Sequence, residues 1–149
     1  MSDLQDRIQT ATRTAMKARD KRLVAALRLV NAELKRLEVD ERKALADADV
    51  IAVLTRMVKQ RNDSRSQYEA AGRTDLAEQE AFEIDVVRSF MPTPLSEAEV
   101  DALIDAAIAT TGAAGMRDMG KVMGQLKGEV AGRADMGTVS AKVKARLSG

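Results

Sequence analysis

Residues 59–83, KQRNDSRSQYEAAGRTDLAEQEAFE, decide how this chain folds, because they place a polar run in the middle of a long amphipathic pattern. On both sides of Gly72, residues of like character recur at alternating spacings of four and three, as on the packed face of a helix. Glycine is common where a helix ends and the chain turns back. The stretch therefore predicts two helices that fold against each other about Gly72.

Folding the two halves about this glycine places apolar residues opposite apolar ones and polar residues opposite polar ones. Arg61 then faces Glu83, and Glu80 lies one turn away. We predict a buried or half-buried polar layer in which Arg61, assisted by Arg65, bonds Glu83 and Glu80. A structural role is preferred over a functional one, because buried charges are unfavourable without partners and these charges have partners within reach.

Helical patterns also fill the remainder of residues 1–91. Ser2 and Gln5 have the spacing of a capping box, and Asp20, Asp47 and Thr74 are expected to cap the next three helices. The inner faces of the first two helices are predicted to carry Leu4, Ile8, Ala11, Ala15 and Ala18, and then Leu23, Leu27, Val30, Leu34 and Leu37. No segment alternates as a strand would. The fold class predicted is all-α, with an N-terminal antiparallel bundle of about four helices.

The pattern changes at residues 92–96, which include both prolines of the chain. Proline ends helices and holds the backbone extended, so this segment is the predicted linker. Ser96 and Glu99 form a second capping-box pattern that restarts a helix. Residues 97–149 are predicted to form a small three-helix domain, with helices from Ser96 to about Thr111, from about Asp118 to Val130, and from about Asp135 to Leu147.

Composition excludes several kinds of chemistry. The 149 residues include no Cys and no His, so disulfides, thiolate nucleophiles and Cys/His zinc sites are absent. We expect no cofactor and no metal. The N-terminus lacks the apolar run of a secretory signal, and no run is long enough to span a membrane. The predicted location is the cytoplasm, without membrane association.

Charge is balanced overall, with 24 basic and 23 acidic residues, but the C-terminal part is basic. From Thr110 onward, seven basic residues outnumber three acidic ones. Residues 115–129 also contain four glycines within a helical pattern, each of which ordinarily costs about 1 kcal/mol in a helix interior. Glycine permits close approach either to a neighbouring helix or to a phosphate backbone, and the sequence leaves both options open.

Three groups of residues give the chain a family resemblance. They are Met16–Lys21 leading into Leu27-Arg28, Val58–Ser64 with Ala71–Glu80, and Asp118–Met123 with Gly132–Asp135. With this pattern the chain resembles the GatB/YqeY family, which comprises free-standing YqeY-like proteins and the C-terminal tail of the B subunit of tRNA-dependent amidotransferase. Five family-motif residues belong to or adjoin the predicted polar layer: Lys59, Gln60, Arg61, Glu80 and Glu83.

The resemblance implies a link to a carbon-nitrogen ligase that uses glutamine as amido-N-donor and acts on mischarged tRNA. In that enzyme the tail helps to hold tRNA, while the catalytic steps occur on parts that are absent here. The implied role is a non-catalytic tRNA-binding or accessory module, with tRNA, an amidotransferase component or an aminoacyl-tRNA synthetase as partner. The candidate phosphate contacts are Lys121, Lys127, Arg133, Lys142 and Lys144. Recognition by shape is expected, because the chain has only three aromatic residues.

The sequence offers two alternative functions. Asp75, Glu80, Glu83 and Arg61 resemble acid-base groups, but no nucleophile-base arrangement or phosphate-binding loop accompanies them. The second alternative is a protein interaction module without RNA binding, which uses an apolar methionine surface. The residues concerned are Met116, Met119, Met123 and Met136, and the simpler interpretation is that they fill the core.

Overall fold

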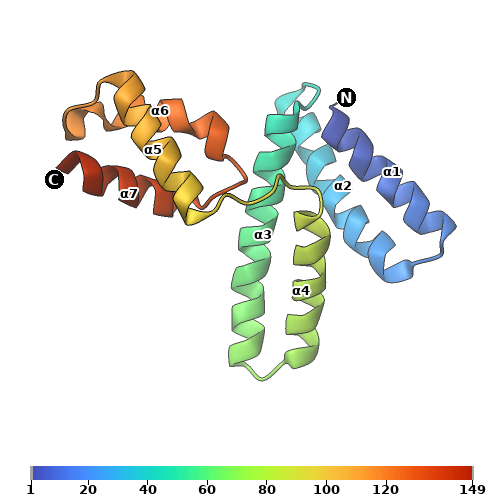
Figure 1. Cartoon of the computed structure of the whole chain (residues 1–149). Helices are drawn as coiled ribbons and strands as arrows, with labels where there is room; N and C mark the ends of the chain where they lie inside the picture. Colours follow the sequence, from blue (N-terminus) through green and yellow to red (C-terminus); the bar gives the residue numbers. More distant parts are fainter. Residues whose placement is uncertain (1, 149) are drawn as a thin grey trace. The chain divides into compact units, whose positions relative to one another are not determined.

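A computed structural model describes residues 2–148, and within that range it consists of helices, turns and loops without a strand. The predicted all-α fold class is thus confirmed. Figure 1 shows the elements in chain order: α1 (Asp3–Lys17), α2 (Lys21–Glu41), α3 (Asp47–Ala70), α4 (Thr74–Arg88), α5 (Glu97–Thr111), the 3-10 helix η1 (Met116–Asp118), α6 (Met119–Val130) and α7 (Met136–Ser148).

The chain divides into two compact units, and the division falls between Met91 and Pro92. The first unit contains α1 to α4 and the second contains α5 to α7. Each unit has a buried apolar cluster of its own. The two units are therefore described separately.

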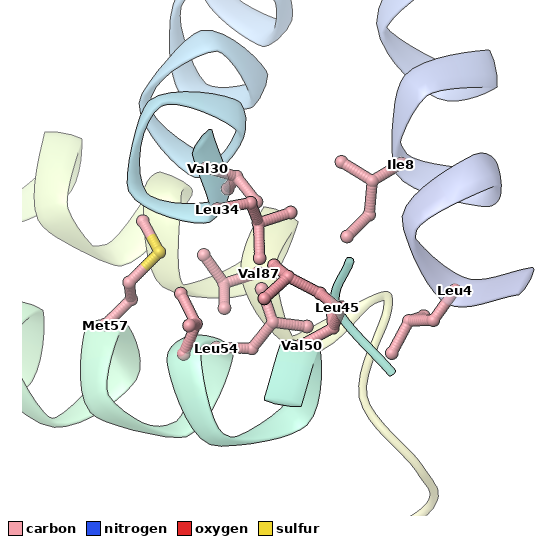
Figure 2. Close-up of a cluster of buried hydrophobic side chains, with 10 residues drawn as sticks. Leu4, Ile8, Val30, Leu34, Leu45, Val50, Leu54, Met57 and Val87 are labelled. Carbon is pink, nitrogen blue, oxygen red and sulfur yellow. The ribbon is translucent and has the colours of Figure 1, made fainter. Parts of the chain in front are cut away.

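In the first unit, α1 packs against α2 and α3 packs against α4 (Figure 1). All four helices and the loop after α2 contribute to one apolar cluster, shown in Figure 2. Its buried members are Leu4, Ile8, Val30, Leu34, Leu45, Val50, Val53, Leu54, Met57 and Val87. A second cluster, centred on Ala15, Ala26, Leu27 and Val86, lies between α1, α2 and α4. The two clusters hold α1 and α2 against the end of the α3–α4 pair that lies away from the Gly72 turn (Figure 1).

The helix starts agree with the sequence in part. Ser2 accepts a hydrogen bond from the Gln5 backbone, and Asp20 accepts one from the Leu23 backbone, as predicted. Two starts differ by one residue, because Asp47 and Thr74 are the first residues of their helices and the N-cap positions are the residues before them. The first residue of a helix depends on local backbone angles, and the sequence pattern predicts its position only to within one or two residues.

One apolar-face prediction and one capping prediction for α1 are wrong. Ala18 is exposed because α1 ends at Lys17. Gln5 does not complete a capping box at Ser2. Its side chain is buried and donates to Glu38 on α2 over 2.7 Å, so it links two helices.

The α3–α4 hairpin turns at Gly72, whose φ of 72° lies in the left-handed region that favours glycine. Arg61 Nη1 lies 2.9 Å from Glu83 Oε2 and 3.6 Å from Glu80 Oε2. This is the predicted pairing across the hairpin. Gln79 adds a hydrogen bond to Glu83 from one turn earlier, over 3.2 Å.

Three other polar residues of α3 stand outside this layer. Arg65 is wrongly predicted, since it pairs with Glu69 on its own helix instead of with Glu80 or Glu83. Lys59 and Gln60 are exposed. The layer is narrower than the polar run of the sequence, because a helix turns about 100° per residue and only part of the run faces α4.

In the second unit, α5 packs on α6 and α7, and α6 packs on α7 (Figure 1). The Ser96 and Glu99 capping box is complete in both directions. Apolar side chains from all three helices meet in one cluster, whose buried members are Val100, Ile104, Ala107, Val122, Leu126, Val130, Val139, Val143 and Leu147.

Candidate nucleic-acid interface

The outer face of α6 carries a stripe of bare backbone. Gly120, Gly124 and Gly128 follow one another at intervals of one helical turn, and all three are exposed. A Cβ atom built on any of them would meet no other atom within 4 Å. Within the second unit, the glycines therefore do not serve close packing of α6 against another helix, which was one of the two options left open by the sequence.

The opposite face of α6 explains why the stripe points outward. Val122, Leu126 and Val130 are buried in the core of the second unit, and Met119 and Met123 pack at its edge. A helix buries the side where its apolar residues gather, which leaves the glycine side in contact with solvent. The fold thus fixes the direction of the stripe without using the glycines themselves.

Two of the candidate lysines flank this stripe. Seen down the helix axis at 100° per residue, Lys127 borders the stripe on the side of Gly120, and Lys121 borders it on the side of Gly128. Within each of these pairs the two residues are two turns apart along the axis. Both are exposed, and the Lys121 side chain is 71% exposed with only a distant pairing to Asp118 at 3.9 Å. We call this surface the α6 glycine-lysine face, made of Gly120, Gly124, Gly128, Lys121 and Lys127.

Arg117 is a further cation that the sequence analysis did not select as a contact. It lies in η1, immediately before α6, and it is exposed. The neighbouring Asp118 braces this turn by accepting a hydrogen bond from the Ala114 backbone over 2.9 Å. This backbone hydrogen bond is the main reason that the pKa of the Asp118 carboxyl is lowered. Arg117 lies directly before the glycine stripe in the sequence, and this position is the signal that could have identified Arg117 as a candidate contact.

Arg133 has a structural position. Its Nε donates to the backbone carbonyl of Thr93 over 3.0 Å, and its own carbonyl accepts from the Leu95 backbone over 2.8 Å. The side chain is only partly exposed. Arg133 thereby fastens the proline-containing segment to the turn between α6 and α7.

Lys142 is engaged in an ion-pair network between α7 and α5. Its Nζ lies 2.9 Å from Asp101 Oδ1 and 3.1 Å from Glu97 Oε1. The hydrogen bond from Lys142 is the main reason that the pKa of Asp101 lies below its ordinary value. Arg146 extends the network to Asp101 and Asp105. Two carboxylates around Lys142 leave it less available to a phosphate than the lysines of α6.

Lys144 is exposed on α7 and belongs to a different helix from the glycine stripe. The structure thus brings Lys121 and Lys127 together on one face of α6, and it places Arg133 and Lys142 in contacts within the second unit. Sequence spacing could not separate these cases, because the partners of Arg133 and Lys142 lie far away along the chain.

The methionines divide between two environments. Met119 and Met123 pack on the core, as the simpler interpretation predicts. Met116 and Met136 are 40% and 37% exposed. A continuous methionine surface therefore does not form from all four residues.

The polar layer of the first unit has the geometry of a structural contact. One guanidinium faces two carboxylates, and burial together with the nearby Glu83 charge raises the pKa of Glu80 despite the opposing effect of Arg61. Asp75 lies outside this layer and pairs with Arg73. Among the described residues, no group of three or more acidic, Cys or His side chains is arranged to hold a metal ion. No helix within residues 2–148 has both the length and the apolar character to cross a membrane.

Comparison with known proteins identifies the family. The model of the YqeY-like protein family matches residues 5–147, which is nearly the whole chain. The chain therefore belongs to the YqeY-like family. The matched region covers most of both units.

Several curated proteins are similar to the chain. A protein of Pyrenophora tritici-repentis named "Altered inheritance of mitochondria protein 41, mitochondrial" is 28% identical over 142 residues, which cover 93% of this chain and 77% of that protein. An uncharacterized protein of Schizosaccharomyces pombe is 31% identical over 90 residues, covering 60% of this chain and 73% of its own length. A Candida glabrata protein with the same name as the first is 33% identical over 88 residues, covering 57% and 48%.

Proposed function

We propose that this chain is a tRNA-binding accessory module that uses the α6 glycine-lysine face to contact phosphates. The observation that carries the proposal is the exposed stripe of Gly120, Gly124 and Gly128 with a lysine on each edge. Three glycines in one helix reduce its intrinsic stability by about 1 kcal/mol each. Because no packing within the second unit compensates for them, contact with a partner is the favoured reason for their presence.

The chemistry of the face suits a sugar-phosphate backbone. Without Cβ atoms, the helix surface can approach a ribose and phosphate ridge closely, and Lys121 and Lys127 can neutralise phosphates on either side. Arg117 supplies a third cation at the start of the helix. The absence of aromatic residues from α6 gives no means of stacking on bases, so recognition by shape is expected.

The family resemblance suggests tRNA as the particular RNA and transamidation of mischarged tRNA as the setting. The sequence predicts no nucleophile-base pair and no phosphate-binding loop, so the role that we propose is accessory. An amidotransferase component or an aminoacyl-tRNA synthetase is the proposed protein partner. The cytoplasmic location also stays a prediction, since two of the similar proteins are named as mitochondrial.

Titration of the full chain into labelled tRNA tests the proposal. Three phosphate contacts predict that affinity falls by roughly 40-fold between 50 and 200 mM salt. Changing both Lys121→Glu and Lys127→Glu is expected to weaken binding at least tenfold at low salt. The matched control changes Arg56→Glu and Lys59→Glu, two exposed cations on α3, and so alters the total charge equally.

The control separates a local contact from a general charge effect. Loss of affinity in the α6 variant alone supports the proposed face. Equal loss in both variants, affinity that does not respond to salt, or no binding at low salt would each overturn it.

A further inference from the structure

A second candidate surface, formed by residues of the first unit alone, lies where α1 meets α2. It is a shallow hollow, which we call the α1–α2 turn surface, and the residues that line it are Met16, Arg19, Lys21, Val24, Ala25 and Arg28. Three of these residues are apolar and three are basic, and none is acidic or aromatic; we call the apolar three the floor of the hollow and the basic three its rim. The proposed tRNA contact makes no use of it.

The floor of this surface exposes apolar side chains that the core does not need. Met16 is 51% exposed although it belongs to α1, and Ala25 is exposed beside it. Val24 packs against the cluster around Leu27 and also lines the hollow. Leu29, one turn beyond Ala25 on α2, is 44% exposed and continues the apolar area along the helix. Thioether side chains adapt readily to a partner's shape, so Met16 suits a docking position.

The rim is positively charged and not neutralised. Arg19, Lys21 and Arg28 are exposed and have no ion pair among the described residues. The acidic residue of the turn, Asp20, has another task, because its Oδ1 accepts the hydrogen bond from Leu23 that starts α2. A ligand with negative charges would therefore complement this rim, while one with positive charges would be repelled.

Arg19 occupies a backbone conformation that favours glycine. Its φ is 56°, and the turn has the paired hydrogen bonds of a Schellman motif, from Arg19 N to Met16 O and from Asp20 N to Ala15 O, each of 3.1 Å. A residue with a side chain is less stable in this conformation than glycine is. The turn would be more stable with glycine, so replacing Arg19 can remove a rim charge without weakening the fold.

We propose that the α1–α2 turn surface binds an acidic protein segment, which places a large apolar side chain on Met16, Val24 and Ala25 and its carboxylates against Arg19, Lys21 and Arg28. The aliphatic floor favours a peptide over RNA, because a phosphate backbone has no apolar group to place there and bases gain most from aromatic stacking. The partner thus has the chemistry of an acidic, amphipathic segment.

Selection from a phage library of random peptides on the full-length protein tests this proposal. The expected outcome is enrichment of peptides in which Asp or Glu residues flank a large apolar residue. Affinities of a synthesised enriched peptide are then measured by fluorescence anisotropy. Met16→Ser and Arg28→Glu are each expected to weaken binding about tenfold or more, as truncation of a central contact does.

Arg19→Gly provides the sharpest variant, because folding and binding are expected to respond in opposite directions. The melting temperature should equal or exceed that of the wild type, while peptide affinity falls several-fold. Arg42→Gly is the matched control. Arg42 follows α2, has a φ of 53° and is exposed, so its replacement by glycine relieves a similar backbone conformation away from this surface. It should leave affinity unchanged.

Three outcomes would overturn the proposal. The first is enrichment of peptides without acidic residues, or no enrichment. The second is peptide binding that Met16→Ser and Arg19→Gly leave unchanged. The third is that no peptide binds while a labelled single-stranded RNA binds and loses affinity in Arg28→Glu, which would make the surface an RNA contact.

Discussion

Arg61 on α3 and Glu83 on α4 join the two helices of the central hairpin through a contact of 2.9 Å between Nη1 and Oε2. Both side chains are mostly buried, at 19% and 12% exposure. Apolar pairs lie toward the open end of the hairpin, where Met57, Leu54 and Val87 belong to the core. The contact therefore fixes the register of α4 on α3, since a shifted helix would bring a charge against apolar side chains.

Removing Glu83 is expected to destabilise the first unit. Glu83→Ala leaves the Arg61 guanidinium half-buried, with only the longer contact to Glu80, so the free energy of unfolding should fall by about 2 kcal/mol, somewhat less than for a fully buried pair. Urea unfolding followed by circular dichroism measures this. Asp85→Ala on the exposed side of α4 is the control. A Glu83→Ala variant as stable as the control would show that the contact does not support the fold.

The Glu80 carboxyl should make stability depend on pH in a particular direction. Burial and the charge of Glu83 raise its pKa in the folded state, so ionised Glu80 opposes folding at neutral pH. As pH falls toward the ordinary carboxyl value, the folded state takes up this proton first and gains stability relative to a variant without the group. Glu80→Gln is thus expected to melt at or above the wild-type temperature at pH 7, with the difference shrinking as the pH falls toward the ordinary carboxyl pKa. A variant that melts well below wild type at pH 7 would contradict this assignment.

Sequence pattern was sufficient for the hairpin because its contacts follow from a single turn. Once Gly72 is the turning point, the face that holds Arg61 must meet the face that holds Glu83, and the structure has this contact. Arg65 was misplaced because an acceptor on its own helix, Glu69, lies four residues away. Such local pairs compete with cross-helix pairs of similar spacing, and periodicity alone does not rank them.

The basic residues of the second unit were harder to interpret from the sequence. Lys121 and Lys142 look alike as isolated lysines, yet Lys142 meets Asp101 only because α7 packs on α5. The Arg133 side chain donates to the backbone carbonyl of Thr93. Every residue has such a carbonyl, so the identity of the residues does not predict this contact. The α6 glycines had two physical explanations, and only the packing of the helix showed which side they face.

Lys142→Met is expected to destabilise the second unit without affecting a phosphate contact. Asp101 has a lowered pKa because Lys142 donates to it, so their interaction stabilises the fold above the ordinary carboxyl pKa and is lost as pH falls through the lower folded value. The melting temperature should therefore drop at pH 7, and the difference from wild type should vanish in acid. Lys144→Met, on the exposed side of α7, is the matched control and should melt like the wild type. If Lys142→Met melted normally but bound tRNA poorly, Lys142 would be a contact instead of a brace.

Gly124→Ala should separate the stability of α6 from its proposed function. A methyl group at this position meets nothing within 4 Å, so the substitution should raise the free energy of unfolding of the unit by about 1 kcal/mol through helix propensity alone. The same methyl group would stand between the helix and a phosphate backbone, so tRNA affinity is expected to fall. Gly120→Ala, one turn earlier, should change both quantities in the same directions. Denaturant unfolding and tRNA titration on the same preparations measure them. A more stable protein with undiminished tRNA affinity would mean that the glycine stripe is not in contact with the RNA, and the lysines alone would then have to account for binding.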